Sequence, residues 1–323
     1  MSAAVGPAPV QFVPTHSQLV VAYSVCRSIA RRAARNFYYA FLVLPRQKCE
    51  ALCAVYAFMR RCDDIADDPN LYVFDRRVKL ADWLDAMHRA MDGHPTDDPV
   101  LLALADARRR FRIPLELLDQ LAFGTAMDLQ EGEVVEDEPF FARAPQPALS
   151  HPLVRYRTFD DLYQYCYRVA SVVGLACIRI FGYRDKAAEP LAERCGLAFQ
   201  LTNIIRDVKE DAAMGRVYLP EDELTRAGLN VDDLCGTPDL GRLRTVFTAT
   251  ADRAREFYRS GEELIPLIDE DSQPALWVLI TIYRGLLNKI AARQYDVLSE
   301  RVRLTSWEKS RVLAKGFLKR LHW

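Results

Sequence analysis

Apolar residues recur in steps of three and four along almost every long segment of this 323-residue chain. The pattern is clearest over residues 21–45, 47–69, 160–182 and 274–298. Such spacing gathers the apolar side chains on one side of an α-helix. Beyond short fragments, the sequence shows neither the alternation that is typical of β-strands nor a GxGxxG phosphate-binding loop. It therefore predicts an all-α fold built as a single large helical domain.

The bulk composition is that of an ordinary globular protein. Half of the residues are hydrophobic and the formal net charge is −1, so no excess of positive charge suggests nucleic acid as a partner. The eight cysteines form no CxxC motif, which favours reduced thiols in a cytoplasmic protein. Residues 1–17 lack the pattern of a secretory signal, and we expect a flexible leader there. The most apolar runs, residues 171–182 and 274–283, are too short to span a bilayer.

Three segments interrupt the helical pattern. Residues 131–152 are acidic and then rich in proline, so we expect a surface loop inserted into a domain of residues 18–323. Residues 210–224 carry a glycine and a proline and are interpreted as a loop that follows a helix. Residues 304–323 are predicted to form a basic helix, which can either pack on the domain or lie on an anionic membrane. One face of that helix can gather Trp307, Ala314, Phe317, Leu318 and Leu321.

The first of two acidic clusters lies at the end of the apolar segment 47–69. Its aspartates form a DDxxD pattern of Asp63, Asp64, Asp67 and Asp68. Asp63 and Asp67 are about one helical turn apart. A pattern of this kind standing alone is more often a solvated helix end. Here the preceding turns are apolar on every side, which places the aspartates at the mouth of a core helix.

The second cluster lies in the stretch FQLTNIIRDVKED, residues 199–211. Its polar residues Gln200, Asn203, Asp207 and Asp211 are spaced by three, four and four positions, so they project from one helix face. Two carboxylates about 5 Å apart repel each other by roughly 3 kcal/mol at an effective dielectric constant near 20. A face of this kind is either exposed to water or occupied by cations.

Two carboxylate clusters on facing helices suit Mg²⁺, which takes one or two carboxylates and completes its shell with water and substrate phosphate. Arg60 and Arg206, which lie beside the clusters, would bind the outer oxygens of a diphosphate. Metal ions favour the departure of diphosphate from carbon, and the allylic cation that remains needs a dry cavity with aromatic walls. Candidates for those walls are Phe37, Tyr38, Tyr56, Tyr165 and Tyr283. Each of them, taken alone, is more often a core residue.

The motifs resemble those of the squalene and phytoene synthases, which join two prenyl diphosphates head to head. The matching stretches are NFYYAFLVLP, AVYAFMRRCDDIAD, YCYRVASVVG, LAFQLTNIIRDVKED followed by GRVYLP, and QYDVLSERV. They occur in the family's order over residues 30–303. The resemblance implies the helical bundle of the isoprenoid synthase type, with a central cavity and three Mg²⁺ ions. The sequence departs from the family pattern at Asn36, where serine is common, and in the loop of residues 131–152.

The resemblance also implies roles for single residues. The implied metal ligands are Asp63, Asp64, Asp67, Asn203, Asp207 and Asp211. The implied diphosphate and substrate contacts are Arg60, Arg206, Arg301, Tyr56, Tyr283 and Phe37, with Arg216 and Tyr218 on a flap formed by GRVYLP. Gln200 is expected at the border between the metal site and the apolar cavity. Tyr165 is implied in proton transfer, which makes it a catalytic candidate together with Asp63, Asp67 and Asp207.

Our main expectation is the Mg²⁺-dependent condensation of two farnesyl diphosphates to presqualene diphosphate, as in the bacterial hopanoid-pathway branch of the family. Whether the reaction continues to squalene, and whether NADPH takes part, is left open by the sequence. The alternative is a phytoene synthase that condenses two geranylgeranyl diphosphates. A class I terpene cyclase and a non-catalytic helical protein that binds lipids or membranes are remoter alternatives. We expect a cytoplasmic protein, and attachment to the inner face of the membrane through the basic helix remains open.

Overall fold

The computed structural model describes residues 12–68, 70–130, 154–236 and 238–322. Nearly all regular structure in these ranges is helical, which confirms the predicted all-α fold. The helices of the first half are α1 (His16–Ala33), α2 (Arg35–Phe41), α3 (Arg46–Ala66), α4 (Val73–Met91), α5 (Pro99–Phe111) and α6 (Leu115–Gln130). Those of the second half are α7 (Phe159–Cys166), η1 (Tyr167–Ser171), α8 (Val172–Phe181), α9 (Ala188–Ala213), α10 (Glu221–Arg226), α11 (Val231–Cys235), α12 (Leu240–Leu264), η2 (Ile265–Leu267), α13 (Gln273–Ala292) and α14 (Ser306–His322).

Capping side chains decide where the first and last helices begin. Thr15 and Gln18 form a capping box, in which each side chain accepts a hydrogen bond from the backbone of the other residue. The predicted leader of residues 1–17 is therefore too long, since α1 already starts at residue 16. Thr305 and Glu308 make the same reciprocal pair, so α14 starts at residue 306 rather than 304.

Two of the long apolar segments are interrupted helices. Residues 21–45 divide at Ala34 into α1 and α2. Residues 160–182 contain the π-helical turn η1 between α7 and α8. Gly196 of α9 faces this turn so closely that a Cβ there would lie 2.6 Å from the carbonyl oxygen of Ala170. A small residue on α9 therefore permits the close approach of the two backbones.

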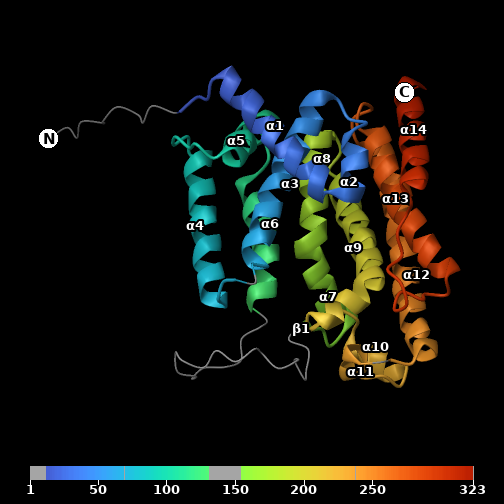
Figure 1. Cartoon of the computed structure of the whole chain (residues 1–323). Coiled ribbons are helices and arrows are strands. Elements are labelled where there is room, and N and C mark those ends of the chain that lie inside the picture. The colour runs from blue at the N-terminus through green and yellow to red at the C-terminus, as the bar shows by residue number, and fades with distance from the viewer. Residues whose placement is uncertain (1–11, 69, 131–153, 237, 323) are drawn as a thin grey trace.

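The helices form one bundle around α3 and α9. α9 packs against η1, α8, α12 and α13, and α3 packs against α1, α4, α5 and α6. Figure 1 shows α4 at one edge of the bundle and α14, beside α13, at the opposite edge. α13 is long and apolar enough to cross a membrane, the one such helix in the described part of the chain, but most of its apolar residues are buried in this bundle. We therefore interpret α13 as a core helix of the bundle.

One short parallel strand pair closes an end of the bundle. β1 (Val154–Arg155) pairs with β2 (Arg216–Val217), and the backbone N–H of Glu221 donates to the carbonyl oxygen of Tyr156 at 2.9 Å. Gly215 precedes β2 with a φ of 74°, a left-handed conformation that glycine adopts at little cost. The segment 210–224, expected to be a loop, is thus the end of α9, a tight turn, a strand and the start of α10. The expected surface loop of residues 131–152 lies outside the described residues.

Candidate active site

An apolar cavity runs along the middle of the bundle, between α2, α3, α8, α9, α12 and α13. It encloses about 940 Å³, part of which is open to solvent, within the usual range of small-molecule sites. Three polar side chains line the end nearer to the acidic clusters, namely Tyr56, Gln200 and Asn203. The opposite end includes Ala192, which precedes Asn203 by eleven residues of α9, or about 16 Å of helix. The cavity is therefore elongated, with one polar and one apolar end.

The first acidic cluster lies at the C-terminal end of α3, two turns beyond Tyr56. Asp63 is largely buried and accepts a hydrogen bond from the hydroxyl of Thr125 at 3.2 Å. Burial, together with the charge of Asp67, raises the pKa of Asp63 to about 6 against the lowering effect of Arg60. Arg60 also forms a 2.6 Å ion pair with Asp64. The buried run before Asp63 confirms that this cluster ends a core helix.

The second acidic cluster occupies one face of α9. Arg206 contacts Asp207 through two nitrogens, and Nη2 of Arg301 lies 2.6 Å from Oδ1 of the same carboxylate. Burial and, to a smaller extent, the neighbouring charge of Asp207 raise the pKa of Asp211 to about 7. Arg301 follows α13 in the chain by nine residues, so the sequence alone does not bring it to Asp207.

Arg216 connects the two clusters. Its Nη2 atom lies 3.4 Å from Oδ1 of Asp67, and its positive charge lowers the pKa of Asp211 against the effect of burial. Arg216 belongs to β2, the strand that follows α9 after the turn at Gly215. The carboxylates of α3 and of α9 therefore face a common space, as the sequence predicts, and the expected flap carries the arginine between them.

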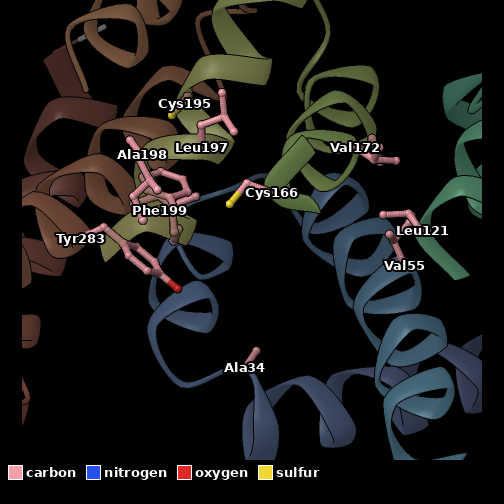
Figure 2. Packing of buried hydrophobic residues seen from close by; sticks show 14 of the residues in the cluster. Ala34, Val55, Leu121, Cys166, Val172, Cys195, Leu197, Ala198, Phe199 and Tyr283 are labelled. Carbon is pink, nitrogen blue, oxygen red and sulfur yellow. The ribbon is translucent and has the colours of Figure 1, made fainter. Parts of the chain in front are cut away.

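Aromatic side chains form two groups around the site. Phe37, Phe199 and Tyr283 pack together, with ring centroids 5.5 Å apart for Phe37 and Tyr283 and 4.6 Å apart for the stacked Phe199 and Tyr283. Figure 2 shows Tyr283 beside Phe199. Burial raises the pKa of Tyr283 to about 12, and the nearby Arg206, Asn203 and Asn36 side chains oppose that rise. The unusual Asn36 thus lies near a residue of the predicted site.

Tyr165 and Tyr218 belong to the second group. Their rings stack at 5.0 Å, and Tyr156 lies 5.3 Å from Tyr165 and 6.1 Å from Tyr218. Neither is among the residues that line the cavity, and both are largely buried. Tyr156 was not predicted, although it stands in the RYRTF stretch close to the flap. Thr125 and Phe199 were also not predicted as site residues. Only Phe199 could have been found from the sequence, because it stands at the start of the second acidic stretch.

The donor set fits a divalent cation bound together with a diphosphate. The Oδ1 atom of Asn203 is buried without a hydrogen-bond partner among the described residues, and it shares a helix face with Asp207 and Asp211. Within the same residues, no three His, Cys, Asp or Glu side chains converge as a ready cation cage. Mg²⁺ does not require one, because it keeps several waters and binds one or two carboxylates plus substrate phosphates. Oxygen donors on both walls meet that description.

Comparison with known proteins identifies the family. The family model described as squalene/phytoene synthase matches residues 30–308. The chain belongs to the squalene/phytoene synthase family. It is therefore a prenyltransferase of the type that joins two prenyl diphosphates head to head, and this family depends on divalent metal ions in general.

The relatives cover nearly the whole chain. A phytoene synthase of Mycobacterium tuberculosis is 38% identical over 302 residues, which are 92% of this chain and 91% of the relative. A 15-cis-phytoene synthase of Synechococcus elongatus is 32% identical over 307 residues, 91% of each. Among solved structures, a dehydrosqualene synthase in complex with ligand is similar at a TM-score of 0.79 and 28% identity, covering 95% of this chain and 99% of that one. The squalene synthase HpnC from Alicyclobacillus acidocaldarius has a TM-score of 0.74 and 25% identity, with 88% and 97% covered. These neighbours confirm the isoprenoid synthase fold.

Proposed function

We propose that this chain is a phytoene synthase, which condenses two geranylgeranyl diphosphates head to head. The curated relatives described above are named phytoene synthases and match along more than nine tenths of the chain. These relatives support phytoene synthase, the alternative in our sequence analysis. They give less support to our main expectation, the condensation of two farnesyl diphosphates to presqualene diphosphate in a hopanoid pathway. Farnesyl diphosphate remains the second candidate, because the solved structures with the same fold are named dehydrosqualene and squalene synthases.

The position of Arg216 is the main structural support for a reaction of prenyl diphosphates. It lies between Asp67 on one wall and Asp211 on the other, beyond Gln200 and Asn203, which line the polar end of the elongated apolar cavity. A diphosphate group bound at this end leaves its prenyl chain pointing into the apolar part. Guanidinium groups bind such oxygens with two parallel hydrogen bonds, and Arg60, Arg206 and Arg301 lie beside the same carboxylates.

The metal ligands proposed are those of the sequence analysis. Asp63, Asp64 and Asp67 would hold Mg²⁺ from the α3 side, and Asn203, Asp207 and Asp211 would hold it from the α9 side. When bound, Mg²⁺ supplies positive charge that stabilises the departing diphosphate. The arginines now bonded to Asp207 then have phosphate oxygens as competing partners, so Arg206 and Arg301 can bind the leaving group without moving to a distant site.

The residues of the cavity protect the allylic cation that remains. The apolar walls exclude water, which would otherwise capture the cation. The faces of Phe37, Phe199 and Tyr283 offer negative quadrupole density to positive charge. Attack by the double bond of the second substrate forms the new carbon–carbon bond, and a proton leaves to close a cyclopropane ring. Tyr165 or the released diphosphate is the proposed proton acceptor.

The second half of the reaction begins when the second diphosphate leaves. Rearrangement of the cyclopropylcarbinyl cation joins the two former C1 atoms, and loss of a second proton forms the central double bond. Two diphosphates and two protons leave in total, so the hydrocarbon forms without a reductant. A reaction that ends at squalene would instead require a hydride donor such as NADPH, for which neither the cavity nor the comparisons offer support.

The test supplies each substrate alone. Purified full-length protein with Mg²⁺ receives farnesyl or geranylgeranyl diphosphate, with and without NADPH, and products are identified by mass spectrometry. We expect phytoene from geranylgeranyl diphosphate in both conditions. Presqualene diphosphate or squalene from farnesyl diphosphate, with no phytoene, would select the second candidate instead.

Matched variants separate chemistry from folding. Asp207→Ala should abolish diphosphate release from either substrate while helical content by circular dichroism stays unchanged. Asp82→Asn, an exposed carboxylate of α4, is the control and should keep wild-type turnover. Retained turnover in Asp207→Ala would refute the assignment of the α9 wall.

A further inference from the structure

Helix α14 presents an apolar stripe to the solvent. Trp307 is 76% exposed, Leu318 is 56% exposed and Phe317 is 40% exposed, and Ala314 between them is exposed as well. At 100° per residue, Trp307, Ala314 and Leu318 point within about 40° of one another, with Phe317 at the side of the same face. These side chains form the outer face of α14, and they extend over about 16 Å of helix.

The inner face of the helix is fixed to the bundle, so the outer face cannot turn inward. A Cβ on Gly316 would overlap the side chain of Val278 in α13. Arg320 donates to the carbonyl oxygen of Val43 at 3.1 Å, and Lys289 of α13 forms a 2.9 Å ion pair with Glu308. Packing on the domain, one of the two expectations for this helix, is therefore confirmed for its inner face alone.

Positive charge flanks the apolar stripe. Arg311 and Lys315 are exposed on the same side, and neither has an acidic partner among the side chains that the structure describes. Glu308 is the single acidic residue between positions 301 and 323, and Lys289 already neutralises it. The whole chain has a formal net charge of only −1, so this surface concentrates positive charge locally.

α14 packs on α13, a helix that forms part of the wall at the apolar end of the cavity. Gly316 contacts Val278, and the ammonium group of Lys319 lies 5.0 Å from the ring of Trp277. On either side of these two α13 residues, Leu276 and Leu279 line the cavity. In Figure 1, α14 runs along the edge of the bundle beside α13. The stripe is thus separated from the cavity by α14 itself and by α13.

We propose that the outer face of α14, formed by Trp307, Ala314, Phe317, Leu318, Arg311 and Lys315, binds the surface of an anionic lipid bilayer with the helix axis parallel to the membrane. An interfacial helix buries an apolar face at the level of the headgroups and draws additional binding from anionic lipids through its basic residues. Trp is favoured at this depth because its ring is amphipathic. In this arrangement α14 and α13 lie between the bilayer and the apolar end of the cavity.

The test measures binding of the full chain to vesicles by flotation, without prenyl substrates. Vesicles of equal parts phosphatidylcholine and phosphatidylglycerol are compared with vesicles of phosphatidylcholine alone. We expect the wild type to float with the anionic vesicles and to bind the neutral ones about tenfold or more weakly. Absence of flotation with anionic vesicles, or equal flotation with both, would overturn the proposal.

Two pairs of substitutions locate the surface. The apolar variant Trp307→Ser/Leu318→Ser and the charge variant Arg311→Glu/Lys315→Glu should each lower anionic vesicle binding by about tenfold or more. The control Phe74→Ser/Lys79→Glu changes an equally exposed aromatic residue and a lysine on α4, at the other edge of the bundle, and should bind as the wild type does. Because none of these residues belongs to the proposed site, diphosphate release without vesicles should stay unchanged. Wild-type flotation of both α14 variants would refute this surface, whatever the enzyme's substrate.

Discussion

At the scale of single residues, Asp211 is the aspartate whose ionisation the fold opposes most clearly. Its folded-state pKa is raised to about 7 by burial and by Asp207, whereas an unperturbed aspartate titrates near 4. Between about pH 4 and pH 7 the folded protein keeps a proton that the unfolded chain has released. The contribution of this group to the free energy of unfolding therefore falls as the pH rises through that window.

Asp211→Asn should stabilise the metal-free protein at pH 8 but not at pH 5. The amide removes a charge that is costly only when the carboxyl is ionised, and we expect a gain of about 1 to 2 kcal/mol after allowing for partial solvent exposure. Thermal unfolding with a chelator present at both pH values measures it. Asp75→Asn, at an exposed position of α4, is the control and should show no such difference. An equal effect of Asp211→Asn at pH 5 and pH 8 would contradict the argument.

Arg301 is predicted to bind diphosphate, although it now contacts Asp207 at 2.6 Å. Arg301→Ala should lower kcat/KM for the prenyl diphosphate by about 100-fold to 1000-fold, the usual loss when one positioned donor is removed. Arg301→Lys should recover only part of that loss, because lysine cannot present two parallel N–H groups. Steady-state diphosphate release gives both numbers.

Arg303 provides the matched control for Arg301. It lies two residues further along the chain, it is exposed, and it is not placed in the site. Arg303→Ala should retain wild-type kcat/KM. If Arg301→Ala and Arg303→Ala lowered kcat/KM equally, the positive charge of the segment, and not a specific contact of Arg301, would explain the effect.

At the scale of elements, the length of the cavity along α9 sets how long a prenyl chain fits. Ala192 lines the apolar end and is almost completely buried. Ala192→Leu should shorten the cavity and lower the ratio of kcat/KM for geranylgeranyl over farnesyl diphosphate by about tenfold or more, since a few misplaced methylenes have effects of this size. Product analysis with the two substrates in competition measures the ratio. The control Ala213→Leu changes an exposed residue of the same helix and should leave the ratio unchanged.

The close contact between α9 and η1 should depend on a missing side chain. A Cβ at Gly196 would lie 2.6 Å from the carbonyl oxygen of Ala170, so Gly196→Ala forces the two backbones apart. We expect a loss of about 1 to 3 kcal/mol in the free energy of unfolding. Gly285→Ala on α13 is the control, because its Cβ would meet only Leu304 at 3.8 Å, and it should be neutral or stabilising by up to about 1 kcal/mol. Urea unfolding compares the two, and equal stability would contradict the steric explanation.

At the scale of the whole molecule, most of the architecture could be predicted from the sequence. The all-α bundle follows from apolar periodicity, and the two acidic clusters follow from helical spacing. The turn η1, the pair β1–β2 and the tyrosine group around Tyr156 could not be predicted, since each depends on a backbone or ring supplied by a distant segment. The floor of the cavity was missed for the same reason, because Ala192, Leu264 and Leu276 come from three helices whose packing no local pattern specifies.

The two acidic walls also predict how the whole molecule responds to ligands. Arg216 is the connection between Asp67 and Asp211, and the carboxylates on both walls repel an added anion as well as each other. Mg²⁺ together with inorganic diphosphate should therefore raise the melting temperature by several degrees, since a ligand at 100 times its dissociation constant adds about 2.7 kcal/mol.

Each component alone should have a much smaller effect on the melting temperature. Diphosphate without metal meets the carboxylates of both walls, and Mg²⁺ without diphosphate lacks the phosphate oxygens that complete its shell. Differential scanning fluorimetry with Mg²⁺, with diphosphate plus a chelator, and with both distinguishes the cases. Asp207→Ala should lose the joint effect, while Asp82→Asn should keep it. A full shift with diphosphate and chelator would mean that the arginines alone hold the anion and that the carboxylates serve another purpose.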